Sequence, residues 1–371
     1  MHVALDVRTI QARYAGDRIY LENLIRHLSR LPEISQLSLY GEARLGDPVP
    51  VEGYAKTEAK VFRAKRGWLW TPVAVPQQLK RDQVDVFHAP YLVPSKAPCP
   101  TVATIHDVTL RLFPEYNRPR IKAGIRNLVL NASARSATAV ITDSEHSRRD
   151  LIRVVRVRPD RIHVIPLAAG EHFTPGDAET ARRRVKELLG LERPFVLAVG
   201  WSSPHKNVPR LLEAVGSLTS GVGRELAVVV VGHPGAHTAE SLRESFPTLE
   251  GRLFFTQWIS NDDLVAYYRA ASLFAFPSLY EGFGLPVLEA MACGTPVVTS
   301  NSSSIPEVAG DAAILVEPRD TAALAAAVEG VASDEALRED LRGRGLEQAA
   351  RFSWDRTAEM TLEVYKHVLG Q

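Results

Sequence analysis

The sequence predicts two α/β domains, each built on a doubly wound, Rossmann-like parallel sheet. Three observations favour this fold class: the chain has 371 residues, 45% of them are hydrophobic, and short apolar runs alternate with helix-like or loop segments in two successive series. Such a length exceeds one ordinary domain and suits two domains of about 170 to 190 residues each. Alternating strands and helices are typical of parallel sheets.

The first series begins with a strand over His2–Val7 and a helix over Asp17–Leu31, whose apolar residues recur at helical spacing. Gly16 lies between them, at the predicted turn from strand to helix. Further strands of this series are expected at Leu37–Tyr40, Val84–His88, Val102–Ile105 and Ala139–Thr142.

A proline- and glycine-punctuated stretch, Pro166–Pro175, marks the boundary between the two series, and the chain after Ser333 is predicted to be helical. We expect an N-terminal domain over residues 1–168, a C-terminal domain over 169–353 and a final helix over 354–371. Strands of the second series are expected at Phe195–Val199, Leu226–Val231, Leu253–Thr256, Leu273–Phe276, Val297–Val298 and Ile314–Val316.

Composition and charge predict a soluble globular protein. The net charge of +1 argues against nucleic acid as the main partner. Two cysteines, Cys99 and Cys293, cannot build a disulfide framework or a metal site alone, so a reduced, cytoplasmic compartment is expected. No signal peptide is expected, and no run approaches the roughly 18 apolar residues of a membrane span. Any membrane contact is therefore expected to be peripheral.

The stretch 276–299 places two carboxylates, a glycine-rich turn and a helix start between two predicted strands. Pro286 suits the start of a helix, where backbone N–H groups favour an anion. Glu281 and Glu289 are expected to reach the same crevice and to accept hydrogen bonds from the vicinal hydroxyls of a sugar. Two glutamates alone would be surface residues, but the turn and the buried strands beside them favour a function.

His205 and Lys206 follow a predicted strand and precede a helix. Positive charge at a helix N-terminus is opposed by the helix dipole, which suggests that an anion such as a phosphate lies nearby. The simpler alternative is a solvated lysine at a helix start.

His106 stands at the carboxyl end of a predicted buried strand, where ligands of open α/β sheets bind. Asp107 follows it and could orient the ring. We therefore expect His106 in the active site, although a lone histidine is more often structural. His88, one strand earlier, is the weaker candidate.

Basic residues of the first half could form a surface for an anionic lipid or a phosphate-bearing acceptor, with a solvated face as the even alternative. They are Arg118, Lys122 and Arg126, which lie opposite Ile121, Ile125 and Leu128; Arg149 and Arg153; and Lys56, Lys60, Arg63, Lys65 and Arg66, which precede Trp68 and Trp70. Asp262 and Asp263 are interpreted as helix-start residues. No His, Cys and Asp cluster has metal-ligand spacing, so no metal is predicted.

These motifs resemble the retaining glycosyltransferases of family 4, and the match spans nearly the whole chain. EGFGLPVLE (281–289) matches the E-x7-E motif of that family. The resemblance implies the GT-B fold, in which two Rossmann-like domains face each other across an interdomain cleft and the last helix crosses back to the first domain. It is strongest to bacterial mannosyltransferases of polysaccharide and O-antigen assembly. Further matching segments are HDVTLRLFPE (106–115), ITDSEHSRRDL (141–151), VIPLAAGEHFTP (164–175), VGWSSPHKN (199–207), IPEVAGDAAILVEP (305–318) and RFSWDRTAE (351–359).

The resemblance also implies roles for single residues. Glu289 would hold the donor ribose, Glu281 would meet hydroxyls of the transferred sugar, and Lys206 would neutralise the diphosphate. His106 would lie beside the reacting sugar, and Gly16 would let the first loop approach the diphosphate. Backbone N–H groups of Gly282, Phe283, Gly284 and Leu285 would contact sugar and phosphate, while Trp258, Ile259 and Ser278 would border the base.

Three departures from the family pattern concern the donor site. Trp201 and His205 occupy the candidate positions of an arginine that commonly accompanies the lysine. The first loop often reads G-x-G-R-Y, whereas here Arg18 replaces the second glycine, so that it either crowds the pyrophosphate or supplies the missing cation. Gln257 stands before Trp258 where glycine is usual.

We therefore predict a retaining, metal-independent glycosyltransferase without a cofactor. It would move a hexose, with mannose from GDP-mannose favoured over a UDP-sugar, to a glycan or lipid-linked acceptor at the inner face of the cytoplasmic membrane. No double-displacement nucleophile is assignable, so same-face attack is expected. The alternative is a catalytically silent nucleotide-sugar-binding protein. A nicotinamide-dependent dehydrogenase would need a G-x-G-x-x-G turn, which residues 16–18 do not supply.

Overall fold

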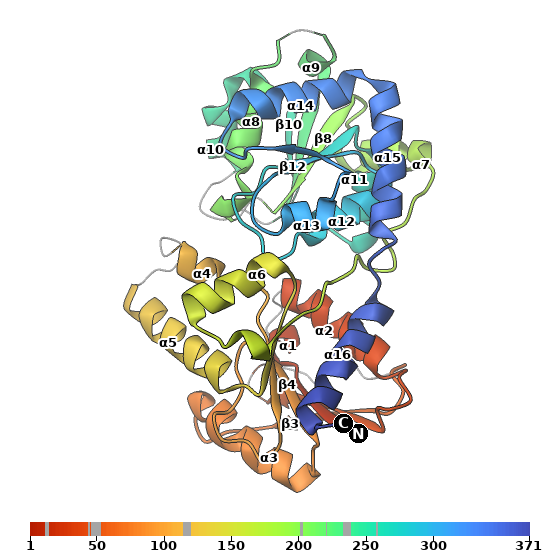
Figure 1. Ribbon diagram of the computed structural model, residues 1–371. Helices are drawn as coiled ribbons and strands as arrows, with labels where there is room; N and C mark the ends of the chain where they lie inside the picture. The colour runs from red at the N-terminus through yellow and green to blue at the C-terminus, as the bar shows by residue number, and fades with distance from the viewer. Residues whose placement is uncertain are drawn as a thin grey trace. The chain divides into compact units, whose positions relative to one another are not determined.

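The computed structural model describes residues 1–11, 15–43, 45, 53–113, 120–200, 203–219, 221–232, 239–256 and 259–371 (Figure 1). The chain folds into two compact units. The first comprises Met1–Leu167 together with Ser353–Gln371, and the second comprises Ala168–Phe352. Each unit is built on its own sheet, in which all strand pairs are parallel.

The first unit has a seven-stranded sheet with the order β3-β2-β1-β4-β5-β6-β7. The order reverses between β1 and β4, which is the switch point at which open α/β sheets bind ligands. The strands are β1 (His2–Asp6), β2 (Gln36–Glu42), β3 (Thr57–Phe62), β4 (Val86–Pro90), β5 (Thr101–Thr104), β6 (Ala139–Thr142) and β7 (Ile162–Val164).

Helices cover the first sheet, and the last helix of the chain is one of them. The α-helices are α1 (Arg8–Gln11), α2 (Ala15–Leu28), α3 (Val75–Asp82), α4 (Thr109–Leu112), α5 (Arg120–Ser136), α6 (Glu145–Asp150) and α16 (Trp354–Leu369). The short 3₁₀ and π segments are η1 (Gly67–Leu69), η2 (Trp70–Ala74), η4 (Leu151–Val155) and η5 (Pro159–Arg161).

Helix α16 returns to the first unit and packs against α2 (Figure 1). Ser353 caps its N-terminus by accepting a hydrogen bond from the Arg356 N–H, and Gly370 ends it in the left-handed conformation at φ 73°. The Tyr365 hydroxyl lies 2.6 Å from Nδ1 of His88 on β4. These contacts tie the end of the chain to its beginning.

The second unit has a six-stranded sheet with the order β10-β9-β8-β11-β12-β13, which repeats the Rossmann-like order of the first six strands. Strand β9 is buried at all five positions, as expected for a parallel strand covered on both faces. The strands are β8 (Phe195–Val199), β9 (Ala227–Val231), β10 (Leu253–Thr256), β11 (Leu273–Phe276), β12 (Val297–Ser300) and β13 (Ile314–Val316).

The helices of the second unit alternate with these strands. They are α7 (Ala178–Leu189), α8 (Val208–Gly216), α9 (Gly221–Glu225), α10 (Ala239–Ser245), α11 (Asn261–Ala270), α12 (Leu285–Ala292), α13 (Ile305–Ala309), α14 (Thr321–Ser333) and α15 (Glu335–Ala349), with 3₁₀ segments η6 (Pro204–Lys206) and η7 (Pro247–Leu249). The predicted fold class of two doubly wound parallel sheets is confirmed.

Two details of the first unit differ from the prediction. Strands β3 and β7 were not predicted: β3 is an edge strand without a buried position, and β7 has three residues. The predicted turn at Gly16 is wrong, because helix α2 already begins at Ala15 and includes Gly16. An added Cβ at Gly16 would meet nothing within 4 Å, so no close packing requires glycine there.

Candidate active site

Lys206 and Glu281 meet at the switch point of the second sheet. They follow β8 and β11, the neighbouring strands between which the strand order reverses. The Lys206 Nζ lies 2.8 and 3.0 Å from the two carboxylate oxygens of Glu281. It also lies 4.7 Å from the centroid of the Phe276 ring. Because an ammonium has three N–H groups, this pairing leaves one for a ligand.

Hydrogen bonds from the loop after β8 to the segments after β11 and β13 hold Lys206 in place. Asn207, at φ 59°, donates its side-chain amide to the carbonyls of Pro277 (3.0 Å) and Pro318 (2.7 Å). The carbonyl of His205 accepts the N–H of Leu279 at 2.7 Å. The backbone of His205 therefore helps to join the two loops. Its predicted role in binding the donor stays a prediction.

Three serines fix the turn that carries Glu281. The buried Ser278 hydroxyl lies 2.6 Å from Oε1 of Glu281, and the Ser303 hydroxyl accepts the Glu281 N–H at 2.9 Å. Ser304 lies within hydrogen-bond distance of the carbonyls of Glu281 (2.9 Å) and Phe283 (2.7 Å). Ser278, predicted to border the base, is thus a direct partner of Glu281.

The glycine-rich turn leads into α12 through a conformation that requires glycine. Gly284 has φ +117°, and a Cβ there would lie 2.7 Å from Cδ1 of Ile305. Leu285 is the first residue of the helix, whose first N–H groups have no partner within the helix. Gly282 is buried, and the Phe283 ring packs edge-on against Phe352 at 5.9 Å. The turn from Gly282 to Gly284 therefore leads directly into α12, which begins at Leu285, one residue before the predicted Pro286.

Glu289 lies on α12 with only 6% of its surface exposed. The Tyr268 hydroxyl, from α11, donates to its Oε2 at 3.0 Å. Burial raises the pKa of Glu289 to about 7, against the opposing effects of the Tyr268 hydrogen bond and the positive charge of Lys206. Hydrogen bonds donated by ligand hydroxyls would lower this raised pKa and favour the ionised carboxylate.

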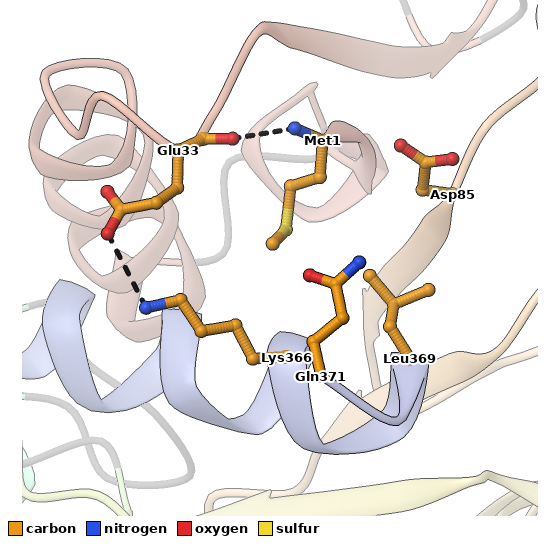
Figure 2. Close-up of a pocket in the computed structure, with 6 residues that line it drawn as sticks. All are labelled: Met1, Glu33, Asp85, Lys366, Leu369 and Gln371. Carbon is orange, nitrogen blue, oxygen red and sulfur yellow. Dashed lines mark hydrogen bonds and ion pairs between the residues drawn. The ribbon is translucent and has the colours of Figure 1, made fainter.

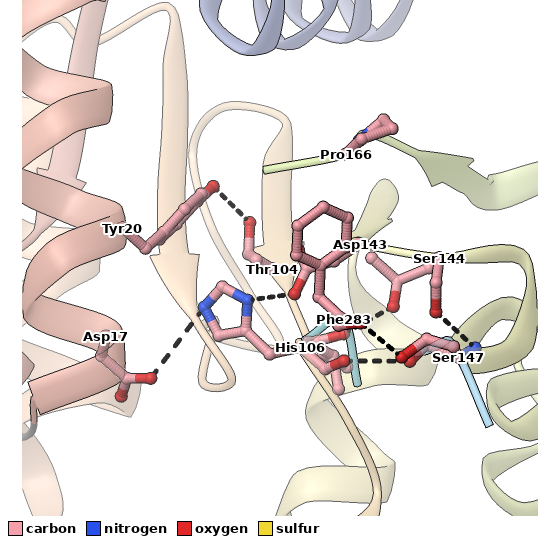
Figure 3. A network of polar contacts seen from close by, with 12 residues as sticks. Asp17, Tyr20, Thr104, His106, Asp143, Ser144, Ser147, Pro166 and Phe283 are labelled. Carbon is pink, nitrogen blue, oxygen red and sulfur yellow. Dashed lines mark hydrogen bonds and ion pairs between the residues drawn. The ribbon is translucent and has the colours of Figure 1, made fainter. Parts of the chain in front are cut away.

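His106 lies in the first unit between two carboxylates (Figure 3). It follows β5, and its Nδ1 is 2.7 Å from Oδ2 of Asp143, which follows β6. Its Nε2 is 3.9 Å from Oδ1 of Asp17 on α2. Burial lowers the pKa of His106, but Asp143 and Asp17 outweigh this effect and raise it to about 9. The imidazole is therefore protonated at neutral pH.

The acid that orients His106 is Asp143, so the expectation for Asp107 is wrong. The Asp107 Oδ1 accepts the N–H of Thr109 at 2.7 Å, two residues along the chain. The Asp107 carboxylate therefore bonds to the first residue of α4, whereas Nδ1 of His106 bonds to Asp143.

The remaining predicted residues do not join these clusters. Arg18 is exposed on α2, and its Nε lies 2.7 Å from Glu22 one turn on. His88 is buried between Tyr365 and Thr104, and burial lowers its pKa to about 3. Ile259 is half-buried in the loop before α11. Trp258, with Gln257 and Trp201, lies outside the described residues.

Asp143 was a site candidate from the sequence by its place, because it directly follows a predicted strand in the matched segment ITDSEHSRRDL. Sequence reasoning missed three other side chains of these clusters. Asp17 stands beside the predicted Gly16 and Arg18, and Tyr91 directly follows β4. Tyr268 carries no signal, because a tyrosine on an amphipathic helix is typically a core residue.

The predicted basic and aromatic surface between residues 56 and 70 is partly wrong. Trp70 is fully buried and stacks on Phe62, with ring centroids 5.1 Å apart. Lys60 pairs with Glu58 (2.7 Å) and Asp82 (3.1 Å). These residues stabilise the edge of the first sheet, because strand β3 includes Glu58, Lys60 and Phe62.

Helix α5 exposes apolar side chains instead. Ile125, Leu128 and Val129 are 61%, 69% and 48% exposed, and they share one helical face by their spacing. Arg126 beside them is also exposed. Arg118 lies outside the described residues. In the part of the chain that the structure describes, no helix is long and apolar enough to cross a bilayer, and no three His, Cys, Asp or Glu side chains gather as a metal site would require.

A surface cavity of about 450 Å³ lies elsewhere in the first unit, where the two chain ends meet (Figure 2). The Met1 ammonium donates to the Glu33 carbonyl at 2.6 Å, and Lys366 pairs with the Glu33 carboxylate at 3.4 Å. The cavity contains none of the predicted site residues. Its lining residues are Met1, Glu33, Asp85, Lys366, Leu369 and Gln371.

Comparison with known proteins gives two family matches. Residues 16–168 match Glycosyltransferase Family 4, and residues 170–348 match Glycosyl transferases group 1. O-antigen chain mannosyltransferase B of Escherichia coli is 30% identical over 382 residues, covering 99% of this chain and 100% of that protein. Serotype-specific mannosyltransferase WbdA of Escherichia coli is 32% identical over 280 residues, covering 73% of this chain and 34% of that protein.

Solved structures with a similar fold span the whole chain. Sucrose-phosphate synthase from Thermosynechococcus elongatus has a TM-score of 0.79 at 21% identity, covering 100% of this chain and 99% of that one. HepE from Anabaena, in complex with UDP-glucose, has a TM-score of 0.75 at 18% identity, and WaaG, a glycosyltransferase involved in lipopolysaccharide biosynthesis, has 0.74 at 16%; both cover 100% of each chain. At these identities the likeness concerns the fold alone, and it confirms the predicted GT-B fold class at the level of two Rossmann-like domains.

Proposed function

Because the chain belongs to the family 4 glycosyltransferases, we propose that it transfers mannose from GDP-mannose to a hydroxyl of a glycan or lipid-linked acceptor. The observation that carries this proposal is the Lys206–Glu281 pair at the switch point of the second sheet. A cation and a carboxylate held together there can meet a phosphate and a sugar hydroxyl of one donor. Mannose is favoured because mannosyltransferase B and WbdA are named for it, with a UDP-sugar as the alternative donor.

Lys206 would stabilise the leaving diphosphate without a metal ion. Negative charge grows on the phosphate oxygens as the bond to the anomeric carbon breaks, and fixed donors aimed at that charge lower the barrier. The third N–H of Lys206 and the backbone N–H of Leu285, the first residue of α12, are two donors that this unit could offer. No cofactor beyond the donor is proposed.

The two glutamates would bind hydroxyls rather than act as an acid and base pair. The oxygens of Glu281 accept hydrogen bonds from Lys206 and Ser278, which fix the orientation of the carboxylate. Among the described residues only Tyr268 donates to Glu289, so its other oxygen is left for the ribose. Vicinal ribose hydroxyls would then favour the charged form of this buried carboxylate.

Retention of the anomeric configuration would follow from attack on the same face. A double displacement needs a carboxylate that can reach the anomeric carbon, and Glu281 and Glu289 are engaged as described above. We propose instead that the leaving phosphate takes the proton of the acceptor hydroxyl while Lys206 holds that phosphate.

The experiment that tests the function is a panel of nucleotide sugars with an oligomannoside acceptor. We expect GDP release and mannosyl transfer with GDP-mannose, and no transfer with the Glu281→Gln variant. Thermal stabilisation by GDP-mannose without turnover would support the alternative of a catalytically silent nucleotide-sugar-binding protein. Turnover with a UDP-sugar alone would change the donor and keep the reaction class.

Peripheral contact with an anionic membrane would bring the enzyme to a lipid-linked acceptor. The supporting feature is α5, where Ile125, Leu128 and Val129 are exposed beside Arg126. Apolar side chains flanked by arginine suit the boundary between headgroups and acyl chains. Arg153, exposed on η4, adds a cation from a segment that packs against α5, although Asp150 pairs with it at 3.0 Å.

A further inference from the structure

Asp17 and His106 of the first unit face each other across a gap (Figure 3). The separation of 3.9 Å between Oδ1 of Asp17 and Nε2 of His106 exceeds the length of a direct hydrogen bond, about 2.7 to 3.2 Å. Nε2 is buried, and no described residue accepts a hydrogen bond from it. Buried polar atoms are nearly always paired in native proteins, so this nitrogen requires a partner that the described residues do not supply.

The His106 ring cannot move to close the gap by itself. Its Nδ1 is held by Asp143 at 2.7 Å, and the Tyr20 ring packs edge-on against it with centroids 4.7 Å apart. The backbone is held as well, because the Ser147 hydroxyl donates to the His106 carbonyl at 3.0 Å. The open nitrogen is therefore fixed in its direction toward Asp17.

Tyr91 holds the other side of the gap. Its hydroxyl donates to Oδ1 of Asp17 at 3.2 Å, and its backbone adopts φ +60°, a left-handed conformation that is strained for a tyrosine. The Tyr91 N–H donates to the Thr104 carbonyl, and the Ser133 hydroxyl donates to the Tyr91 carbonyl, both at 2.9 Å. Strain of this kind persists where the surroundings enforce it and is typical of functional positions.

We propose that Asp17 and His106 together bind one hydroxyl group of a saccharide substrate, with Tyr91 as the positioning residue. The hydroxyl would accept the Nε2–H of His106 and donate to the Asp17 carboxylate. An oxygen about 2.8 Å from each atom spans the observed separation. This inference rests on the proposed function and adds to it a binding residue, Asp17, on the first unit.

The charge around the gap selects a hydroxyl over other groups. Asp17, Asp107 and Asp143 all act on His106, so a phosphate or carboxylate would meet three acids for one cation. An ammonium would meet the imidazolium. A hydroxyl is neutral and is both donor and acceptor, as the two sides of the gap require. The titratable groups that surround His106 are Asp17, Tyr20, His88, Tyr91, Asp107 and Asp143.

The hydroxyl could belong to the transferred sugar or to the acceptor, and the first experiment distinguishes them. Asp17→Asn, in the full chain, is assayed with GDP-mannose alone for slow hydrolysis and with an oligomannoside for transfer. Loss of a hydrogen bond to a charged group predicts a roughly ten- to hundredfold decrease in the affected kcat/KM. Decreased hydrolysis assigns the hydroxyl to the transferred sugar. A raised acceptor KM with unchanged hydrolysis assigns it to the acceptor.

Two further variants separate binding from folding and from charge. Tyr91→Phe removes only the hydrogen bond to Asp17, and we expect a smaller change of the same kind if Asp17→Asn fails to fold. Asp107→Asn is the matched control, because it also removes one negative charge near His106 but keeps an oxygen for the Thr109 N–H. Equal kinetic effects of Asp17→Asn and Asp107→Asn would overturn the proposal, since charge alone would then explain both.

A readout that needs no turnover is the ¹⁵N resonance of His106 Nε2. We expect it to shift on addition of GDP-mannose or of the oligomannoside to the wild type, and not to shift in Asp17→Asn. No shift with either probe, although GDP-mannose protects the protein thermally, would mean that only water occupies the gap and would overturn the proposal. A shift without any transfer would keep the hydroxyl site and contradict the proposed function alone.

Discussion

The two units share the order of six strands and differ in where they place charge. The second unit sets a cation beside a carboxylate at its switch point, between the loops after β8 and β11. At the switch point of the first unit, Asp6 at the end of β1 pairs with Arg8 at 2.7 Å, while His88 on β4 is buried and, by its lowered pKa, neutral. In the same unit, His106 follows β5 and lies among carboxylates, and its Nε2 has no hydrogen-bond partner among the described residues. The same topology thus carries a site suited to phosphate and a site suited to hydroxyls.

The largest expected effect tests the phosphate side of this comparison. Lys206→Met should lower kcat for mannosyl transfer by about 100- to 1000-fold, or roughly 2.7–4 kcal/mol in barrier, because the leaving diphosphate loses its cation. Turnover is measured as GDP release at saturating GDP-mannose. The double variant Lys206→Met/Glu281→Gln is the matched control, since it removes the unpaired carboxylate: stability should return and turnover should not. A decrease in kcat of less than about tenfold would contradict the assignment of Lys206 to the phosphate site.

Glu289→Gln should separate binding from stability in the second unit. The folded-state pKa of Glu289, about 7, lies above its ordinary value of 4.5, so folding loses stability as pH rises from 4.5 to 7. The neutral variant escapes this loss and should be more stable than the wild type above pH 7, by about 3 kcal/mol. Its thermal stabilisation by GDP-mannose should disappear. Equal melting temperatures of the two proteins at pH 5 and pH 8 would contradict the buried, protonated Glu289.

Asp143→Asn should lower the stability of the first unit, whereas Glu289→Gln should raise that of the second. The folded-state pKa of His106, about 9, lies above its ordinary value of 6.5, so its stabilisation is complete below pH 6.5 and is lost as pH rises to 9. Without Asp143 the pKa of His106 falls, so the stabilisation is smaller and its loss, which still starts near pH 6.5, is complete at a lower pH. The basic limb of the pH–rate profile should move with it, whereas Asp107→Asn should move it less. An unmoved limb would show that turnover does not depend on protonated His106.

The smallest effect on turnover is expected at α5, an apolar face of the first unit. Ile125→Ser/Leu128→Ser should abolish flotation with phosphatidylglycerol vesicles and leave transfer to a water-soluble oligomannoside unchanged. Val222→Ser is the matched control, because Val222 is an exposed apolar residue of the second unit, 39% exposed. Equal vesicle binding of wild type and the double variant would exclude α5 as the membrane contact.

The strands were predictable where they are buried on both faces. Ala139–Thr142 and Leu273–Phe276 have the predicted bounds because every position in them is apolar or β-branched and buried. The edge strand β3 was not predicted, because Glu58 and Lys60 interrupt its apolar pattern. An edge strand can form with side chains that are only half-buried.

The sequence could predict single residues of the sites, but it could not predict which residues contact one another. Glu281 and Lys206 each follow a predicted strand, but their ion pair depends on β8 and β11 being neighbours, which only the crossover order decides. Asp17, Tyr91 and His106 come from three elements whose spacing in sequence carries no mutual signal. A pairwise contact between distant segments is a property of the folded chain, whereas composition and periodicity report on one segment at a time.

Helix α16 has a consequence for the order of folding during synthesis. His27 lies 2.6 Å from Asp355, 328 residues further along the chain, and His88 meets Tyr365 across 277 residues. The first unit therefore lacks a structural helix until residues 353–371 have been synthesised, while the second unit, Ala168–Phe352, is continuous and precedes them. We therefore expect the second unit to complete its fold before the first, in contrast to the usual order in which the N-terminal domain folds first.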